Sequence, residues 1–486
     1  MIINNKLIFA TALTSSLAGG VQFAFCKSES PNIIVIVADD MGYGALGAYG
    51  GKEPLSRTPN LDQFAEEGIR FTDGYVSAST SGPSRAGILT GRYQQRFGIY
   101  ANCDLQNPGT GVPEEVVMMP QLLKETGYNT AAIGKWHSGH EPGMIPLNKG
   151  FDEFFGFYGA QSNFFDDEDI KELGIKIPRP SKEIYDGLEV VNDYDYLTYE
   201  FTDRAVDFIE RNRDEKFMLY LAYNAVHDPV QVPEEEAAKF SNVENIGFRN
   251  RAAMLHTLDA GIGRVISSLK EHDIDDNTLI IFLSDNGGLP NWWEGNNGVL
   301  RGNKRQRWEG GIRVAYMMRY PNGIDKGQVR GEMVSAIDIL PTALDVANID
   351  PTEYELDGVS MTPLFKKRHK EEIHDYLFWA GGNNYNLENG KLLPIPSPGS
   401  ADNPPAAWAV RSHQWKLVHF NQTDRTYLFD MSRSAEESDQ MDLYDQHPEV
   451  VADLTSRFKS WFNDVHQTPL SWHTGFYNEL VEFTKE

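Results

Sequence analysis

The fold of this chain is decided by the stretch Asn32-Ile-Ile-Val-Ile-Val-Ala-Asp-Asp40. An apolar run without polar alternation is typical of a strand that is buried on both faces of a parallel sheet. Similar short runs recur at Thr130–Ile133, Phe217–Tyr223 and Leu279–Leu283. Helical patterns interrupt this series at Asn60–Glu67 and Phe248–Leu269. Strands that alternate with helices predict an α/β fold with a central, mostly parallel sheet flanked by helices.

The sequence changes in character after about residue 350. Asn383–Pro405 is rich in Asn, Pro and Gly and predicts a loop. Trp408–Phe420 alternates loosely, Thr426–Met431 resembles its hairpin partner, and Glu449–Phe462 predicts a last helix. We therefore expect a catalytic domain over residues 30–375 and a small C-terminal subdomain over residues 376–486, with an antiparallel sheet and a helix.

The first residues predict a signal peptide over residues 1–26, because Lys6 is followed by the mostly apolar run Leu7–Ala24. A membrane anchor is the alternative, but the run falls short of the ~20 residues that span a bilayer. Cleavage predicts a secreted or periplasmic protein, unless Cys26 carries a lipid anchor. Only Cys103 would then remain, which leaves no internal disulfide. No later stretch is apolar enough to predict a transmembrane segment.

The chain has 486 residues and a formal net charge of −26. This length suits one large domain and a smaller one. An acidic protein is a poor partner for nucleic acid, which needs a basic face. The charge does not exclude a small anionic substrate, because a few cations in a pocket dominate the local field.

Oxygen ligands follow two of the predicted strands. Asp39 and Asp40 end the first run, and Ser284-Asp-Asn-Gly-Gly288 follows Leu279–Leu283. Adjacent carboxylates repel each other unless a cation lies between them, and ligands bind beyond the carboxyl ends of such strands. Three carboxylates and an amide suit Ca²⁺ or Mg²⁺ better than Zn²⁺. Solvated acids in a capped turn and an Asn-Gly hairpin turn are the alternatives.

A third motif, Ser79-Thr-Ser-Gly-Pro-Ser-Arg85, precedes a helical run. Pro83 suits the first turn of a helix, and the polar residues before it could cap that helix. Helix N-termini favour anions, and the planar fork of Arg85 suits a sulfate or phosphate. The motif therefore places Ser81 where an oxyanion would bind, although an ordinary capped helix start is the alternative.

These residues carry a family resemblance. The stretch from Ser81 to Arg92 is similar to the sulfatase signature, in which Cys or Ser, any residue, Pro, any residue and Arg lead to Thr-Gly-Arg. Further stretches resemble blocks of the same family in the same order: Thr58-Pro-Asn-Leu-Asp62, Gly134-Lys-Trp-His137, Val226-His-Asp-Pro229, Leu300-Arg-Gly-Asn-Lys304, Trp308-Glu-Gly-Gly-Ile-Arg313, Trp408-Ala-Val-Arg411 and Trp415-Lys-Leu417.

The resemblance implies an alkaline-phosphatase-like fold and hydrolysis of sulfate esters. It implies that a serine-type maturase oxidises Ser81 to formylglycine (3-oxoalanine). One Ca²⁺ per site would be held by Asp39, Asp40, Asp285, Asn286 and the modified residue 81. Arg85 would steady the aldehyde hydrate, and the sulfate would be surrounded by Lys135, His137, His227 and Lys304.

The chemistry of these residue types fits such a division of roles. One hydroxyl of a hydrated aldehyde would attack sulfur, with Asp285 as the candidate base. His227 or Lys304 would protonate the leaving alcohol. His137 would take the proton of the second hydroxyl as sulfate leaves. The match around Lys304 is imperfect, because Asn303 replaces a frequent glycine and the bulky stretch Arg305–Trp308 follows.

The expected substrate is a sulfated saccharide, with a galactose or N-acetylgalactosamine sulfate as the first choice within glycosaminoglycans, mucin or algal galactans. Aromatic residues near a polar pocket suit the apolar faces of sugar rings, although they could equally belong to the core. The candidate sugar contacts are Asp104, His140, Trp292, Trp293 and Arg307.

Two other functions stay open at this point. A phosphate or phosphonate monoester hydrolase of the same superfamily is one, although the His and extra Asp ligands of two-zinc phosphatases are missing beside Asp39 and Asp285. A non-catalytic glycan-binding protein with an unmodified Ser81 is the other, and the intact set of acids and cations argues against it.

Overall fold

The computed structural model describes residues 30–103, 109–166, 183–289, 296–369, 371–382, 385–388, 391–394, 406–421, 424–467 and 474–485. Several predictions from the sequence fall on other residues. The signal peptide, Cys26, Asp104, Trp292 and Trp293 lie outside the described residues.

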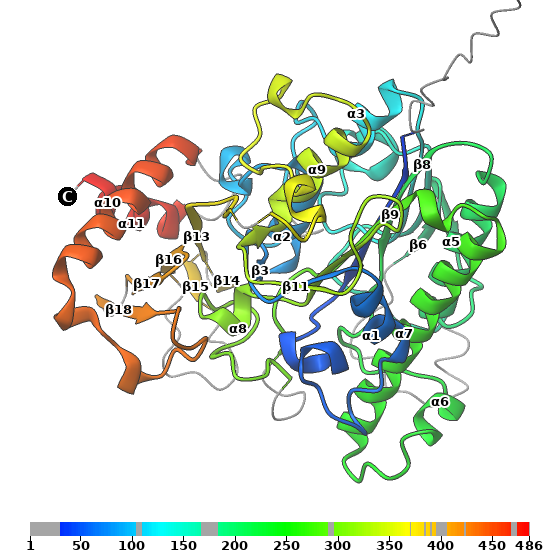
Figure 1. The fold of residues 1–486 in the computed structure, drawn as a ribbon, viewed down its shortest axis with the longest axis horizontal. Helices are drawn as coiled ribbons and strands as arrows, with labels where there is room; N and C mark the ends of the chain where they lie inside the picture. The colour runs from blue at the N-terminus through cyan, green and yellow to red at the C-terminus, as the bar shows by residue number, and fades with distance from the viewer. Residues whose placement is uncertain are drawn as a thin grey trace, which may run out of the picture.

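A ten-stranded mixed sheet forms the larger part of the molecule (Figure 1). Its strands lie in the order β11 (Gln328–Arg330), β2 (Ile69–Phe71), β10 (Tyr316–Arg319), β9 (Thr278–Ser284), β1 (Asn32–Ala38), β8 (Phe217–Ala222), β4 (Asn129–Lys135), β5 (Glu153–Phe157), β6 (Ile184–Asp186) and β7 (Glu189–Val191). The five strands from β9 to β5 are parallel, and β10, β6 and β7 run against their neighbours. The predicted α/β fold is confirmed, and the four apolar runs are central strands.

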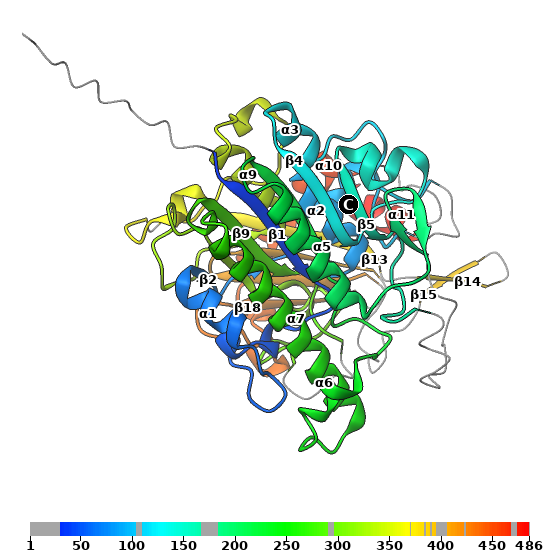
Figure 2. The same cartoon turned by 90° about the vertical axis from the view of Figure 1, so that its right-hand side faces the viewer.

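Helices cover both faces of this sheet because alternate side chains of each strand point to opposite faces. On β1, Ile34 and Ile36 pack with α1 (Pro59–Glu67), α5 (Leu197–Arg211) and α7 (Ile246–Glu271). Figure 2 shows α5 and α7 lying across this face. Ile33 and Val35 pack with α2 (Ser81–Thr90), α3 (Met119–Glu125) and α9 (Ile339–Val346) on the other face. Strand β1, which lacks polar alternation, is thus buried on both faces of the sheet.

Shorter elements complete the larger part. They are strands β3 (Gly74–Tyr75) and β12 (Val334–Ser335), which pair with each other, and helices α6 (Glu234–Ala238) and α8 (Glu309–Ile312). Helix α6 packs against α7 beyond the carboxyl ends of the central strands.

A smaller antiparallel sheet lies beside the main sheet, with two helices, in the orange and red region of Figure 1. Its strands are β13 (Tyr376–Gly382), β16 (Ala406–Ser412), β17 (Trp415–Phe420) and β18 (Arg425–Asp430), and its helices are α10 (Pro448–Val465) and α11 (Thr474–Lys485). The predicted antiparallel sheet with a terminal helix is confirmed. An apolar cluster that includes Trp308 and Trp379 joins this sheet to the larger part.

Two details of the C-terminal prediction were wrong. Trp408–Phe420 is two strands, because the chain reverses at His413 and Gln414 and β16 pairs with β17. The region predicted as a loop contains a short hairpin of β14 (Tyr385–Glu388) and β15 (Lys391–Pro394). Both errors concern hairpins, whose pairing is stabilised by contacts across the turn and leaves a weak signal in a single strand.

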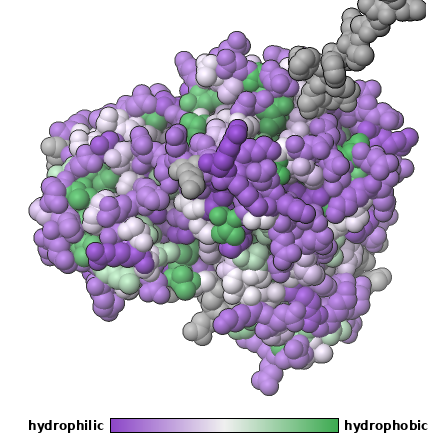
Figure 3. Space-filling model, viewed as in Figure 1, coloured by the Kyte–Doolittle hydropathy of each residue, from purple (hydrophilic) through white to green (hydrophobic). Residues whose placement is uncertain are grey.

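The surface in Figure 3 is mostly hydrophilic, with hydrophobic groups in small separate areas. On this face the apolar groups are scattered and form no single large patch. Across the described residues, none of the helices is long and apolar enough to cross a membrane.

Candidate active site

The carboxyl ends of β1 and β9 bring two acidic stretches together. These strands pair in parallel with Ala38 beside Ser284, so the residues that follow emerge side by side. The backbone N–H of Asp40 donates to Asp285 Oδ1 at 3.2 Å, and Asn286 Nδ2 donates to Asp40 Oδ1 at 2.8 Å. Asp40 has a φ of 61°, which turns its carboxylate away from the strand direction. The structure therefore places the two predicted oxygen-ligand stretches at one point.

Ser81 is the first residue of α2 and is fully buried beside these acids. Its Oγ donates to Asn286 Oδ1 at 3.2 Å and, over a longer 3.4 Å, to Asp39 Oδ1. The polar residues before Pro83 were expected to cap this helix, but the N-cap residue Thr80 makes no side-chain hydrogen bond to it. The N–H of Gly82 instead donates to Asn102 Oδ1 at 2.9 Å, so a distant loop caps this helix.

Three cations meet the three carboxylates. Lys135, the last residue of β4, lies 2.6 Å from Asp39 Oδ2 through its Nζ. Arg85, one turn after Ser81, donates from Nη2 and Nε to Asp285 Oδ2 at 2.8 and 3.0 Å. Lys304 Nζ lies 2.5 Å from Asp40 Oδ1.

Two histidines border this cluster in different ways. His137 is buried just past β4, and neither of its ring nitrogens has a hydrogen-bond partner among the described residues. Burial, reinforced by the positive charges of Lys135 and Arg85, holds the pKa of His137 well below its usual value. A neutral His137 is therefore available as a proton acceptor.

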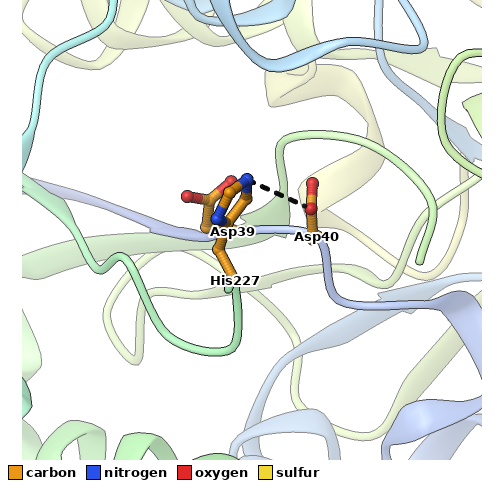
Figure 4. Close-up of side chains that lie close together, drawn as sticks. All are labelled: Asp39, Asp40 and His227. Carbon is orange, nitrogen blue, oxygen red and sulfur yellow. Dashed lines mark ion pairs between the residues drawn. The ribbon is translucent and has the colours of Figure 1, made fainter. Parts of the chain in front are cut away.

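His227 follows β8, and its side chain lies beside the carboxylates of Asp39 and Asp40 (Figure 4). Its Nε2 lies 3.5 Å from Asp40 Oδ2, and its Nδ1 lies 2.6 Å from the Asp228 carbonyl oxygen. The carbonyl contact favours a proton on Nδ1, which leaves Nε2 toward the carboxylate. The His227 side chain is 14% exposed, whereas Asp40 is completely buried, so this histidine marks the more open side.

The three carboxylates are not equally compensated. Burial raises the pKa of Asp39 even though Lys135 lies beside it. Burial also acts to raise the pKa of Asp285, but the positive charges of Arg85, Lys135 and Lys304 together outweigh it and lower this pKa to about 2. Lys304 and His227 likewise keep the pKa of Asp40 below its ordinary value against its burial. The site thus holds two carboxylates that stay ionised, Asp40 and Asp285. The third, Asp39, would be stabilised in its ionised form by a further cation.

The donor set fits a metal ion. Ligand atoms of Asp39, Asp40 and His227 lie within 4.8 Å of one another. Asp40 Oδ2 is buried and accepts no hydrogen bond within the described part of the chain, which is costly for a carboxylate oxygen. A hard divalent cation would satisfy it. The sequence predicted Asp39, Asp40, Asp285 and Asn286 as ligands, and the structure adds His227 to the residues that face the same space.

The predicted sugar contacts are less closely tied to this cluster. His140 is partly exposed, and no hydrogen bond or ion pair links it to the acids among the described residues. Arg307 is buried, and its guanidinium donates to the carbonyl oxygens of Arg305 and Gly381. These bonds brace the loop after Lys304, and a sugar contact by Arg307 stays a prediction.

Sequence reasoning missed two residues at the site. Asn224 lies two residues past β8, and both of its buried amide atoms lack a hydrogen-bond partner in the described structure. Arg305 directly follows Lys304 with a left-handed backbone, at a φ of 76°. An arginine beside a site lysine was the available signal for Arg305, whereas Asn224 has no local signal at all.

Buried acids that fit a hard cation, a hydroxyl at a helix N-terminus and several cations are the arrangement expected of a hydrolase that acts on anionic esters. Residues 31–349 match the family model described as Sulfatase. The chain therefore belongs to the sulfatase family, as the signature at Ser81 predicted, and is a sulfuric ester hydrolase. Residues 301–464 match the model described as N-sulphoglucosamine sulphohydrolase, C-terminal.

Relatives agree along most of the chain. It is 30% identical to the uncharacterized sulfatase YdeN of Escherichia coli, over 92% of this chain and 88% of that protein. It is 34% identical to the N-acetylgalactosamine-6-sulfatase of Homo sapiens, over 69% of this chain and 66% of that enzyme. The crystal structure of Ps i-CgsB in complex with k-i-k-neocarrahexaose superposes with a TM-score of 0.79 at 32% identity, covering 94% of this chain and 98% of the other.

Proposed function

We propose that this sulfatase removes sulfate from sulfated saccharides, with a galactose or N-acetylgalactosamine sulfate as the preferred class. The observation that carries the proposal is the buried Ser81 Oγ, held between Asn286 and Asp39 at the start of α2. Similarity to an N-acetylgalactosamine-6-sulfatase and to a protein bound to neocarrahexaose supports a saccharide carrying galactose-type sulfates.

Ser81 is proposed to be converted to formylglycine by a serine-type maturase, and Ca²⁺ to be the metal. Asp39, Asp40, Asp285 and Asn286 would hold the cation together with residue 81. The hydrated aldehyde would supply one hydroxyl for attack on sulfur and a second through which sulfate is released, while Ca²⁺ would supply positive charge for the sulfate oxygens.

The chain's own residues would bind charge and move protons. Arg85, Lys135 and Lys304 stand within reach of the acids and would stabilise the developing negative charge. Asp285 was the base expected from the sequence, but Arg85 holds its Oδ2 here. Asp39 accepts the hydrogen bond from residue 81 and is the alternative base.

The proton transfers to the leaving alcohol and during sulfate release would be made by the two histidines and Lys304. His227, on the more open side, would donate to the leaving alcohol, with Lys304 as the alternative donor. His137, kept neutral by burial among cations, would accept the proton that is lost as sulfate leaves.

The test is sulfate release from a panel of sulfated mono- and disaccharides by protein made with a serine-specific maturase. Ser81→Ala is the matched variant, and a peptide mass showing loss of two hydrogens at residue 81 reports the aldehyde. Release that vanishes in Ser81→Ala and with a chelator supports the proposal. An aldehyde-bearing protein that cleaves no sulfate ester but hydrolyses phosphonate or phosphate monoesters would replace it.

An enzyme with an unmodified Ser81 that binds the saccharides without releasing sulfate would indicate a glycan-binding protein. The intact set of acids and cations favours catalysis over this alternative.

We further propose that residues 1–26 direct the chain to the periplasm or out of the cell, with Cys26 as a lipid-anchor site in the alternative. The proposed catalytic domain is residues 30–375 and the proposed subdomain residues 376–486. Fractionation of cells and N-terminal sequencing of the mature protein would separate cleavage from anchoring, and cytoplasmic full-length protein would contradict both.

A further inference from the structure

Arg305 is held in an unusual backbone conformation beside the nucleophile loop. Its φ of 76° lies in the left-handed region, which is uncommon for a residue with a side chain. Its backbone N–H donates to the Ser79 carbonyl oxygen at 2.7 Å, two residues before Ser81. The preceding residue, Lys304, reaches Asp40. Arg305 is therefore fixed next to both the nucleophile and the acidic cluster.

The guanidinium of Arg305 has no partner in the described parts of the chain. Its Nε is buried and makes no hydrogen bond, and no ion pair involves this side chain. Two other buried arginines of the molecule are paired, Arg85 with Asp285 and Arg411 with Asp73. A buried donor without an acceptor is costly. Such a donor beside an active site points to an acceptor that a bound molecule brings.

The loop around Arg305 is braced in advance. Arg307 Nη1 donates to the Arg305 carbonyl oxygen at 2.6 Å, and its Nη2 reaches the Gly381 carbonyl on β13. The N–H of Gln306 donates to the Asn303 carbonyl oxygen at 3.0 Å. A loop that is already ordered loses less entropy when a ligand binds. The Arg305 backbone is thus positioned before any substrate arrives.

The position of Arg305 relative to the other cations indicates which part of a bound substrate it would contact. Arg85, Lys135 and Lys304 are almost fully buried and each contacts a carboxylate of the cluster. Arg305 is partly exposed and contacts none of these carboxylates. Burial lowers the pKa of Arg305, and the negative charge of Asp40 offsets only part of this effect, which places the two residues in the same site. Arg305 stands farther out than the cations that would meet the reacting sulfate.

We infer that Arg305 is a specificity-determining residue that binds a second anionic group of the saccharide, a neighbouring sulfate or a uronate carboxylate. Both groups present oxygens that the planar guanidinium fork can grip with two parallel hydrogen bonds. This inference rests on the proposed function and names a narrower substrate class for it: saccharides with two negative groups on the same or adjacent rings.

The experiment compares kcat/KM on matched pairs of sulfated saccharides, in which one member carries an extra sulfate or an extra carboxylate. Arg305→Gly is the principal variant, because glycine accepts the left-handed backbone without strain. Arg305→Lys keeps the charge and removes the fork. Lys326→Ala, which removes an exposed lysine in the turn after β10, is the control for lost positive charge.

We expect Arg305→Gly to lower the ratio of kcat/KM for the doubly charged member to that for its partner by about 10- to 100-fold, mainly through KM. Arg305→Lys should lie between wild type and Arg305→Gly, and Lys326→Ala should keep the wild-type ratio. The arm with the larger change, sulfate or carboxylate, identifies the group.

An unchanged ratio in Arg305→Gly would overturn the inference; if kcat/KM fell equally on both members, Arg305 would be assigned to the reacting sulfate instead. Failure of the wild-type, aldehyde-bearing enzyme on every sulfated substrate would count against the proposed function itself. Thermal melting of each variant separates a binding effect from loss of fold.

Discussion

The protein buries two clusters of charge that look alike in composition and differ in how they are completed. The catalytic cluster consists of Asp39, Asp40, Arg85, Lys135, Asp285 and Lys304. The second, here called the bridging cluster, lies between the two sheets and consists of Asp73, Tyr75, Glu309, Arg313, Arg411, Lys416 and Glu437. Both are built from residues far apart in the sequence.

In the bridging cluster, every buried charge lies beside an opposite charge of the protein, and Glu437 Oε1, which accepts no hydrogen bond within the described residues, still has Lys416 next to it. Lys416 Nζ lies 2.8 Å from Glu309 Oε1 and 2.7 Å from Glu437 Oε1. Asp73 lies 3.1 Å from Arg313 and 3.3 Å from Arg411. Since Lys416 and Arg411 belong to the antiparallel sheet and Glu309 and Asp73 to the larger part, these contacts hold the two together.

In the catalytic cluster and among the residues that border it, by contrast, some buried groups lack protein partners. Asp40 Oδ2, both ring nitrogens of His137 and Arg305 Nε have no hydrogen bond within the described residues. A buried polar group without a partner is destabilising. The comparison teaches that buried charge alone does not mark an active site, whereas buried charge left incomplete by the protein does.

The largest expected effect tests the catalytic cluster. Asp40→Asn removes a proposed metal ligand and the partner of Lys304. Loss of metal-based charge stabilisation amounts to several kcal/mol, so sulfate release should fall by about 1,000-fold or more. Turnover and bound metal are measured together. Asp325→Asn, at a half-exposed carboxylate of the opposite end of the sheet, is the control, and an Asp40→Asn enzyme with more than about a tenth of wild-type turnover would contradict the prediction.

The second prediction tests the bridging cluster. Lys416→Met leaves Glu309 and Glu437 as buried carboxylates without their shared cation. Breaking a buried pair in this way costs about 3–5 kcal/mol of unfolding free energy. Urea unfolding measures this loss, and turnover per folded molecule should remain near that of wild type.

A compensating variant sharpens this result. Adding Glu309→Gln and Glu437→Gln to Lys416→Met removes the uncompensated charges and should recover part of the lost stability. If Lys416→Met instead abolished turnover at unchanged stability, the bridging cluster would serve catalysis and not only the stability of the contact between the two sheets.

The third prediction concerns pH. Burial, together with the negative charge of Glu309, raises the pKa of Glu437 from 4.5 to about 7. The folded state therefore binds this proton more tightly than the unfolded chain. Its stabilising contribution is complete below about pH 4.5 and is lost as the pH rises through about 7.

Unfolding free energies measured across this range should show the effect as a difference between wild type and Glu437→Gln. The wild-type free energy should fall relative to that of the variant between about pH 4.5 and 7 and run parallel to it above. Parallel curves throughout would show that Glu437 does not titrate in this window.

The smallest expected effect is the loss of an exposed ion pair, which serves as a reference for the loss of the buried one. Arg211 lies 2.8 Å from Glu153, and both side chains are 47% exposed. Exposed ion pairs contribute about 0–1 kcal/mol, because solvent screens them and ordering the side chains costs entropy. Arg211→Ala should therefore change the unfolding free energy by no more than about 1 kcal/mol. A loss as large as that in Lys416→Met would mean that burial does not distinguish the two pairs.

Much of the fold could be predicted, because its signals are local. The runs at β1, β4, β8 and β9 lack polar alternation, and their burial on both faces follows from that pattern alone. The meeting of the acidic stretches that follow β1 and β9 could be predicted for a similar reason, since parallel strands end at one edge of the sheet. The hairpins at β16–β17 and β14–β15 could not, because their pairing leaves little local trace.

Other parts of the site have no local signal. The N–H of Gly82 is capped by Asn102, and the unpartnered Asn224 and Arg305 become visible only when their surroundings are known. The stretches around Glu309, Arg411 and Lys416 were identified only as family blocks, and the structure gives them a task in joining the two sheets.

The sequence by itself determined the residue types at each strand end, the signature that begins at Ser81 and the family to which the chain belongs. Only the tertiary structure decided which charges meet. Asp40 and Asp285 are 245 positions apart, and their contact depends on β1 and β9 pairing with Ala38 beside Ser284. Local preferences act over a few residues, whereas such pairing is set by burial across the whole sheet. For that reason the residues of the catalytic cluster could be predicted from the sequence, whereas which of its buried groups lack a protein partner could not.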